Sequence, residues 1–399
     1  MPRILSIATL YPNAHAPRFG TFVARQLEAL AARDGWDMTV INPIGVPPVA
    51  AGRYKSLAEA AVDGVEGGVA VHRPRFTLIP KFGARLNPAL IARSVLPIAR
   101  RLHAERPFDL VDAQFFYPDG PAAARIARQL DLPLSIKARG ADISHWGAQE
   151  FSADKMRQAA DQAAGLLSVS MALARDMAKI GLPQDKITVH YTGLDRTLFK
   201  PLDKAECRQK LAAGFGIAEG GRLLATVGAL IPRKGQRFVI EALEQLADTQ
   251  LILVGKGEDE RALRQLAGDA GDRVHFLGSL DHKLLPVVLS AADAMVLPSA
   301  SEGLANAWVE ALACGTPLVI TDAGGAKELV QNDTAGRIVD RTADAIAAGV
   351  TEVLTANYAA ECVASNAAQF SWEANAAALA NYYSSLIAQA QVSPRAFRS

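Results

Sequence analysis

Two glutamates, Glu302 and Glu310, flank a run of small residues in the stretch SEGLANAWVEALACGTPLVITDAGG. NAWVEALAC predicts a helix, because Gly315 and Pro317 follow it as a typical helix end. Glu302 then lies in the loop before the helix, and Glu310 lies inside it. The free backbone N–H groups at such a helix start bind anions, and a diphosphate suits them. The pattern therefore predicts a site for an anionic ligand.

Each carboxylate has a ligand-binding and an ordinary interpretation. Apolar residues surround Glu310, so its helix should be largely buried, and a buried carboxylate needs a partner. Glu310 could accept two hydrogen bonds from a ribose diol, with Glu302 on the sugar side of the phosphates. Alternatively, Glu302 is an exposed loop acid and Glu310 belongs to a solvated helix face. We favour the ligand-binding interpretation.

Length and composition restrict the class of protein. The chain has 399 residues, too many for one compact core, and its formal net charge of +1 creates no field that would attract nucleic acid. Three widely spaced cysteines, Cys207, Cys314 and Cys362, argue against a disulfide framework or a zinc site and fit a reducing, cytoplasmic compartment. No apolar run is long enough to span a bilayer. We interpret RILSIAT near the N-terminus as a buried strand rather than a signal peptide.

Short β-rich apolar runs alternate with amphipathic stretches along most of the chain. Examples are RILSIAT, DLVDAQ and LPLSIKARG in the first half, and RLLATVGAL, QLILVGKG and AMVLPSA in the second. This alternation is typical of parallel sheets with crossover helices. We therefore expect an α/β protein with two Rossmann-like, doubly wound domains. The expected bounds are residues 1–190, residues 191–372, and a C-terminal helix over residues 373–390.

The segment from Lys81 to Arg106 is basic, with a single acid among six cations. Its helix should span about residues 87–104, with Asn87 as the cap, Pro88 in the first turn and a kink at Pro97. One interpretation is a surface for anionic lipid headgroups or for a phosphorylated acceptor. The other, which we favour slightly, is an ordinary solvated helix face.

The second half resembles the retaining glycosyltransferases of family 4. SEGLANAWVEALACGTPLVITDAGGAKELV resembles the E-x7-E signature of that family, and VGALIPRKG, LILVGKGEDE and VHFLGSLDHKLLPVVLSAADAMVLPS match further blocks in order and spacing. The match is specific over about residues 160–390 and much weaker before them. The resemblance implies a GT-B fold, with two Rossmann-like domains facing a deep interdomain cleft, a nucleotide-sugar in that cleft, and a terminal helix that crosses back to the first domain.

The resemblance assigns roles to residues of the donor site. Glu310 matches the glutamate that holds the ribose hydroxyls, Glu302 the one near the sugar, and Lys234 the lysine that neutralises the diphosphate leaving group. The remaining donor-binding candidates are Gly20, Gly228, Arg233, Lys256, Leu280, Gly303, Leu304, Ala305 and Asn306.

Two departures affect this assignment. Ala229 stands where the family usually has a phosphate-binding arginine, and Arg233 could replace that arginine or face solvent. Arg139 stands where the family often has a histidine after the fourth strand. Arg139 could bind a phosphate or a sugar hydroxyl, or pair with Asp142. With Glu302 and Lys234 it completes the set of catalytic candidates.

Acceptor contacts are expected from the first domain. His15 and Arg18 lie in the first loop, YPNAHAPRFGTF, and Asp142 and His145 follow the fourth strand. The resemblance implies transfer from a UDP-sugar or GDP-sugar to the hydroxyl of a saccharide or lipid-linked acceptor, in cell-surface polysaccharide or glycolipid synthesis. No D-x-D motif is present, so we expect no metal and no cofactor. The protein would lie in the cytoplasm or peripherally on the inner face of the membrane. The alternatives are an inactive nucleotide-sugar-binding regulatory relative and an epimerase on the same architecture.

Overall fold

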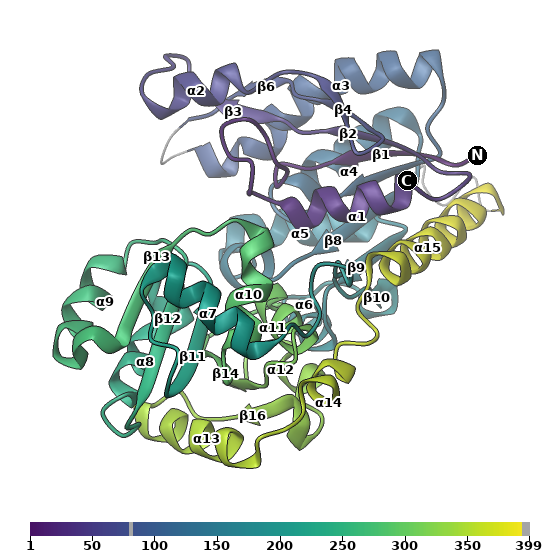
Figure 1. Cartoon of the computed structure of the whole chain (residues 1–399). Coiled ribbons are helices and arrows are strands. Elements are labelled where there is room, and N and C mark those ends of the chain that lie inside the picture. The colour runs from purple at the N-terminus through teal and green to yellow at the C-terminus, as the bar shows by residue number, and fades with distance from the viewer. Residues whose placement is uncertain (80–82, 393–399) are drawn as a thin grey trace. The chain divides into compact units, whose positions relative to one another are not determined.

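The computed structural model describes residues 1–79 and 83–392 (Figure 1). The chain forms two compact units, and the first is discontinuous. It comprises Met1–Gly193 with Trp372–Ser399, whereas the second comprises Leu194–Ser371. The sequence prediction had placed these divisions after residues 190 and 372. Each unit has its own parallel sheet and its own core.

The first unit is built on an eight-stranded sheet in the order β10-β9-β8-β7-β1-β2-β5-β4, with a separate pair β3-β6. All neighbours pair in parallel except β4 and β5. The strands are β1 (Arg3–Ile7), β2 (Asp37–Ile41), β3 (Ile44–Val46), β4 (Gly64–Glu66), β5 (Val69–His72), β6 (Arg75–Thr77), β7 (Leu110–Ala113), β8 (Leu134–Ala138), β9 (Gly165–Ser168) and β10 (Ile187–Val189). The expected buried strand at the N-terminus is confirmed as β1, whose last four residues are buried.

Helices cover this sheet because their apolar residues recur every three or four positions. They are α1 (Thr21–Ala31), α2 (Arg53–Glu59), α3 (Asn87–Glu105), α4 (Asp119–Leu130), α5 (Glu150–Gln162), α6 (Met171–Lys179) and α15 (Trp372–Val392). Leu27 and Leu30 of α1 share one core cluster with Leu379 and Tyr383 of α15, and the two helices lie side by side in Figure 1. The C-terminal helix therefore completes the core of the first unit.

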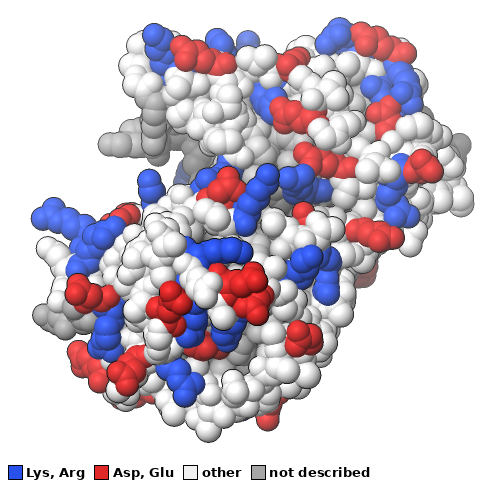
Figure 2. Space-filling model, viewed as in Figure 1, with Lys and Arg blue, Asp and Glu red and all other residues white. Residues whose placement is uncertain are grey.

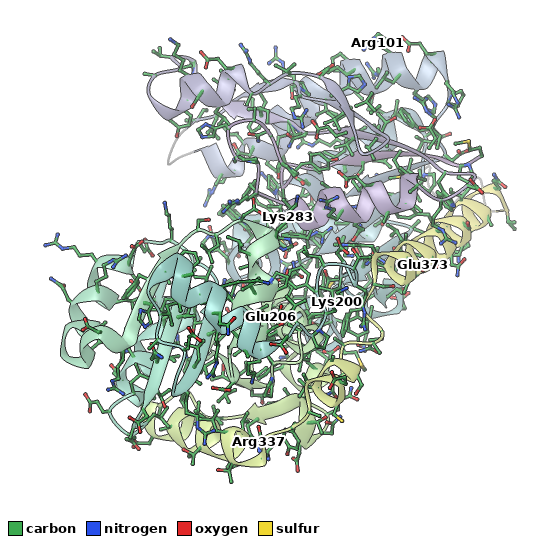
Figure 3. All side chains as sticks on the ribbon, viewed as in Figure 1. Arg101, Lys200, Glu206, Lys283, Arg337 and Glu373 are labelled. Carbon is green, nitrogen blue, oxygen red and sulfur yellow. The ribbon has the colours of Figure 1, made fainter. Side chains whose placement is uncertain are left out.

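Helix α3 corrects one detail of the sequence prediction. Asn87 is the first helical residue rather than the cap, a position that Leu86 takes, and the helix continues through Pro97 to Glu105. Arg93, Arg100 and Arg101 are exposed, and Figure 3 shows Arg101 on the outer side of the helix. Lys81, which opened the predicted basic segment, lies outside the described residues.

The second unit has a six-stranded, wholly parallel sheet in the order β13-β12-β11-β14-β15-β16. The strands are β11 (Arg222–Val227), β12 (Thr249–Val254), β13 (Val274–Gly278), β14 (Ala294–Leu297), β15 (Leu318–Ile320) and β16 (Gly336–Ile338). The helices are α7 (Lys204–Phe215), α8 (Gln236–Ala242), α9 (Glu260–Ala267), α10 (Leu285–Ala291), α11 (Asn306–Ala313), α12 (Ala326–Leu329), α13 (Ala343–Ala356) and α14 (Ala360–Ser365). The α/β fold expected from the sequence is therefore confirmed in both units.

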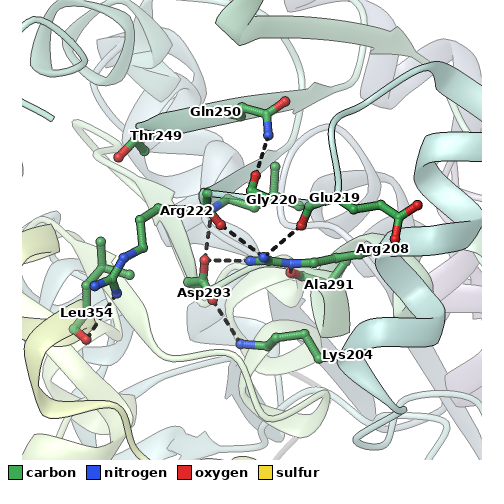
Figure 4. A network of polar contacts seen from close by, with 12 residues as sticks. Lys204, Arg208, Glu219, Gly220, Arg222, Thr249, Gln250, Ala291, Asp293 and Leu354 are labelled. Carbon is green, nitrogen blue, oxygen red and sulfur yellow. Dashed lines mark hydrogen bonds and ion pairs between the residues drawn. The ribbon is translucent and has the colours of Figure 1, made fainter. Parts of the chain in front are cut away.

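Asp293 organises the amino-terminal edge of the second sheet (Figure 4). Its carboxylate contacts Arg208 NH2 at 2.7 Å and Lys204 Nζ at 3.1 Å, both from α7. It also accepts a hydrogen bond from the backbone N–H of Leu223, at 2.8 Å. These contacts fasten α7 to the edge of the sheet opposite the loops that follow β11 and β14.

Charges of both signs are mixed over the face shown in Figure 2, as expected for a net charge of +1. Within residues 1–79 and 83–392, no helix combines the length and the apolar character needed to cross a membrane.

Candidate functional site

Glu302 lies at the carboxyl edge of the second sheet, in the loop that joins β14 to α11. In parallel sheets this edge collects the loops that follow the strands, so polar side chains from several loops meet there. Lys234 and Arg233 come from the turn after β11, Pro232–Lys234. The Lys234 ammonium donates a hydrogen bond to Glu302, and Arg233 NH1 lies 3.4 Å from the same carboxylate oxygen. The side chain of Glu302 is only 9% exposed, and that of Lys234 only 13%.

This cluster holds two cations and one carboxylate, so its net charge is positive. It lies beside the start of α11, where free backbone N–H groups add to the positive potential. Arg233 also donates to the carbonyl oxygen of Ser301, so its guanidinium is directed at this loop although the side chain is 39% exposed. Of the two positions considered for Arg233, the structure therefore shows the one beside Glu302. The arrangement can bind an anion beside Glu302.

Two glycines hold the Glu302 loop in place. Gly324 has a φ of 53°, and a Cβ atom there would lie 2.2 Å from the carbonyl oxygen of Glu302. The N–H of Gly325 donates to the carbonyl oxygen of Gly303, at 2.8 Å. Only a residue without a side chain permits this close approach of two backbones. The GG of the sequence signature therefore shapes the loop before α11.

Glu310 lies in α11, as expected, and its side chain is 12% exposed. The neighbouring Trp308, Val309 and Ala311 are fully buried, which confirms the prediction that this stretch is largely buried. The partner that a buried carboxylate requires is His282, whose Nε2 lies 3.2 Å from Glu310 Oε1. Sequence reasoning missed His282.

Three loops that follow β11, β12 and β13 are joined by backbone hydrogen bonds. The N–H of Leu230 donates to the carbonyl oxygen of Lys256 at 3.1 Å, and the N–H of Gly255 donates to that of Gly278 at 2.8 Å. A Cβ atom on Gly255 would lie 1.9 Å from the carbonyl oxygen of Gly228. The glycines thus permit the contact, while Lys256 remains exposed at the rim. Leu280, two residues after Gly278, is half-buried.

Ala229, the residue that departs from the family pattern, has a structural contact. Its carbonyl oxygen accepts a hydrogen bond from Nε2 of the buried Gln236, at 2.8 Å. Leu304 and Ala305 are buried immediately before α11, and Asn306 is its first residue.

In the first unit, Gly20 caps α1 with a φ of 73°. A Cβ atom at this position would lie 2.6 Å from the carbonyl group of Leu10, so the turn requires glycine. His15 and Arg18 of the same loop are exposed. His15 Nδ1 lies 2.9 Å from the hydroxyl oxygen of Ser56.

Arg139 follows β8 and reaches the first turn of α1. Its guanidinium carbon lies 4.9 Å from the centre of the Phe22 ring, and its Nε donates to the carbonyl oxygen of Gln114 at 2.8 Å. Its NH2 group donates to the side-chain oxygen of Gln114. The alternative pairing of Arg139 with Asp142 is therefore not formed between their side chains.

Asp142 is fully buried, and its carboxylate accepts hydrogen bonds from the backbone N–H groups of Phe116, Arg139, Gly140 and Ile143. These contacts shape the turn after β8. His145 is exposed and packs edge-on against Trp146, with ring centres 4.8 Å apart. Among the described residues, contacts therefore place Arg139 against α1, but no contact joins His15 or His145 to Arg139.

Sequence reasoning also missed Lys137 and His190, two buried polar residues of the first unit. Burial, followed by the charge of Arg139, lowers the pKa of Lys137 well below its ordinary value of 10.5. A lysine inside the apolar strand LSIKA was the available signal. Over residues 1–79 and 83–392, no group of three or more His, Cys, Asp or Glu side chains could hold a metal ion.

Comparison with known proteins gives concordant matches. Residues 208–370 match the family described as glycosyl transferases group 1, and residues 20–198 match that described as glycosyltransferase family 4. The chain is 28% identical to a protein named as a teichuronic acid biosynthesis glycosyltransferase, TuaC of Bacillus subtilis, over 88% of each chain. It is 36% identical to a GDP-mannose-dependent monoacylated alpha-(1-6)-phosphatidylinositol monomannoside mannosyltransferase of Corynebacterium glutamicum, over 37% of this chain and 42% of that one.

Among solved structures, Anabaena HepE in complex with UDP-glucose has the same fold. The TM-score is 0.73 at 23% identity, over 96% of this chain and 100% of HepE.

Proposed function

We propose that this chain transfers a hexosyl group from a nucleotide diphosphate sugar to an acceptor hydroxyl, with retention of configuration. The premise is that the chain belongs to glycosyltransferase family 4 and has the GT-B fold. The observation that carries the proposal is the position of Glu302, which contacts Lys234 and Arg233 in the loop before the helix that contains Glu310. One nucleotide-sugar offers a group to each part of this arrangement.

The diphosphate would lie against the two cations and the N–H groups at the start of α11. Charge accumulates on the diphosphate as the glycosidic bond breaks, and preorganised cations stabilise that charge. Lys234 and Arg233 supply two positive charges without a metal ion, so we propose metal-independent transfer. Glu302 would exchange its contact with Lys234 for contacts with the sugar when the donor binds.

The ribose diol would replace His282 as the hydrogen-bonding partner of Glu310. A carboxylate accepts two hydrogen bonds from neighbouring hydroxyls, which suits a ribose. The acceptor hydroxyl would attack from the face that the diphosphate leaves, with the leaving phosphate helping to remove its proton.

The donor base is proposed as uracil or guanine. The Corynebacterium relative is named for GDP-mannose, whereas the HepE structure holds UDP-glucose. The loop from Gly278 to Leu280, beside Lys256, would contact the base. Both donor classes therefore belong in the first experiment.

The acceptor is proposed as a saccharide or lipid-linked saccharide of the cell surface, since the relatives are named for teichuronic acid and phosphatidylinositol mannoside synthesis. Peripheral contact with the inner face of the membrane, from the cytoplasm, would use α3. Its exposed Arg93, Arg100 and Arg101 provide positive charge, although Arg101 pairs with Glu105 at 3.3 Å. His15, Arg18 and His145 remain the proposed acceptor contacts in the first unit, and Gly20 a proposed donor contact. Asp142 is no longer proposed as an acceptor contact, because it is fully buried and its carboxylate binds the backbone of the turn after β8.

The test is a thermal-shift titration with UDP-glucose, GDP-mannose and ADP-glucose, with and without EDTA. We expect one base class to raise the melting temperature of the wild type but not of Glu310→Gln, with no effect of EDTA. Glu244→Gln is the control, because Glu244 is an exposed glutamate of the same unit. No shift with any donor would contradict the proposal. Binding without donor hydrolysis or transfer would instead favour the regulatory alternative.

A further inference from the structure

A chain of buried side chains runs through the first unit from the start of α15 to Arg139. Its first link is His190, whose Nε2 donates to the carbonyl oxygen of Asn375, at 2.9 Å. Because a carbonyl oxygen only accepts, Nε2 carries the proton, and in a neutral ring Nδ1 is then an acceptor. Lys137 Nζ lies 2.6 Å from that Nδ1 and donates to it.

Lys137 makes its second contact with Gln26 of α1, at 2.7 Å from Nζ to Oε1. The Lys137 amine is only a donor here, and each of the two acceptors takes one of its N–H groups. His190 and Lys137 are 4% and 1% exposed, so water does not compete with these contacts. The amide oxygen of Gln26 must therefore face Lys137.

The orientation of Gln26 determines that of Gln114. With its oxygen facing Lys137, Gln26 presents its NH2 group to Oε1 of Gln114, at 3.2 Å. The NH2 group of Gln114 donates to the buried carboxylate of Asp112. A donor at one end, Lys137, and an acceptor at the other, Asp112, thus fix both amides in one direction.

This orientation of the Gln114 amide also suits Arg139. Gln114 presents two oxygens to the guanidinium, its backbone carbonyl at 2.8 Å from Nε and its Oε1 facing NH2. The opposite orientation of Gln114 would point an NH2 group at Arg139, and two donors repel each other. NH1 of Arg139 has no hydrogen-bond partner within residues 1–79 and 83–392 and is not fully buried, so it is available to a ligand.

We propose that Lys137 is a positioning residue, which fixes Gln26 and Gln114 so that Arg139 presents NH1 to the substrate. Lys137 itself touches no substrate. The inference rests on the proposed function, since it assumes that Arg139 acts in transfer. It also makes the orientation of Arg139 depend on Asn375, which binds His190 and donates to the carbonyl oxygen of Tyr191 at 2.6 Å.

The experiment is a double-mutant cycle of Lys137→Met and Arg139→Gln, with the hydrolysis of UDP-glucose and GDP-mannose as the assay. We expect Arg139→Gln to lower kcat/KM about 10- to 100-fold and Lys137→Met about 3- to 10-fold. In the Arg139→Gln background, Lys137→Met should have no further effect on kcat/KM. The effect of Lys137→Met on the melting temperature should be present both in the wild-type background and in the Arg139→Gln background.

Ser168→Ala is the matched control, because Ser168 is a buried polar residue of the neighbouring strand β9 whose hydroxyl takes no part in this chain of contacts. It should leave kcat/KM unchanged. If Lys137→Met fails to fold, Gln26→Met takes its place in the cycle, because it interrupts the same chain at the next link.

Two results would overturn the inference, and they are distinguishable. An equal loss from Lys137→Met in both backgrounds would show that Lys137 acts on the fold rather than through Arg139. No loss from Arg139→Gln would remove Arg139 from the proposed site, and the inference with it. The donor site would still stand on the Glu310→Gln result.

Discussion

His282 Nε2 lies 3.2 Å from the carboxylate of Glu310, at the place proposed for a hydroxyl of the donor ribose. The histidine is 59% exposed, and its ring packs edge-on against Phe199, with centres 5.0 Å apart. The contact is therefore an exposed one that a ligand can displace at small cost, since such pairs contribute at most about 1 kcal/mol.

We expect His282→Ala to strengthen donor binding about two- to five-fold, because Glu310 then no longer exchanges one partner for another. Calorimetric titration with UDP-glucose and GDP-mannose measures the change. Lys283→Ala is the control, because it shortens the side chain at the adjacent exposed position. Weaker binding by His282→Ala would mean that the histidine itself contacts the donor.

Gly324→Ala should reduce both donor binding and transfer. Alanine at a φ of 53° is strained, and its Cβ atom would lie 2.2 Å from the carbonyl oxygen of Glu302, so the Glu302 loop must move. The control is Gly216→Ala, which has a φ of 70° in the same unit but no atom within 4 Å of the new Cβ.

Both glycine variants should lose about 1 kcal/mol of stability from the backbone strain. Only Gly324→Ala should in addition raise the dissociation constant of the donor, by about 10-fold or more. Equal donor affinities in the two variants would separate Gly324 from the site.

Much of this site could be predicted because its signals are local. Glu302, Glu310 and Gly324 lie within one stretch of 23 residues, and the apolar runs that became β11, β12 and β14 are long enough to be recognised as strands. The predicted cations Lys234 and Arg233 both lie against Glu302, a contact that the sequence did not predict.

The remainder depends on contacts between distant residues. His282 lies 28 positions from Glu310 in a polar turn, and Lys137 lies 53 positions from His190. Neither spacing along the sequence indicates that the two residues of the pair are in contact. The three-residue strands β10 and β16 were missed because such short runs carry no clear alternation.

Asp119 should give the protein a distinct pH dependence of stability. Burial raises the pKa of its carboxyl group from 3.8 to about 7, while Thr9 donates its backbone N–H and its hydroxyl to the two oxygens. Because the folded protein holds this proton more tightly than the unfolded chain, raising the pH from about 4 to 7 lowers the free energy of unfolding. Above pH 7 the contribution of this group no longer changes.

Urea unfolding of wild type and Asp119→Asn between pH 4 and pH 8 measures this contribution. The difference in unfolding free energy between the two proteins should fall with pH by at most about 1.4 kcal/mol per unit below pH 7. Asp176→Asn serves as the control, because the Asp176 side chain is half-exposed and pairs with the exposed Lys179, at 2.8 Å. Parallel curves for wild type and Asp119→Asn would show that the carboxyl group does not titrate in this range.

Asp293→Asn should destabilise the second unit while leaving donor binding intact. The carboxylate holds Lys204, Arg208 and the N–H of Leu223 at the sheet edge opposite the candidate site, and it is only 18% exposed (Figure 4). An amide has one oxygen and no charge, so Arg208 loses its ionic partner, at a cost of about 1–3 kcal/mol.

Asp333→Asn is the control, because Asp333 is 81% exposed and pairs with Arg337 at 3.3 Å. We expect a lower melting temperature for Asp293→Asn alone, with the same shift on adding UDP-glucose or GDP-mannose as the wild type. A smaller donor-induced shift would mean that the two edges of the sheet are coupled.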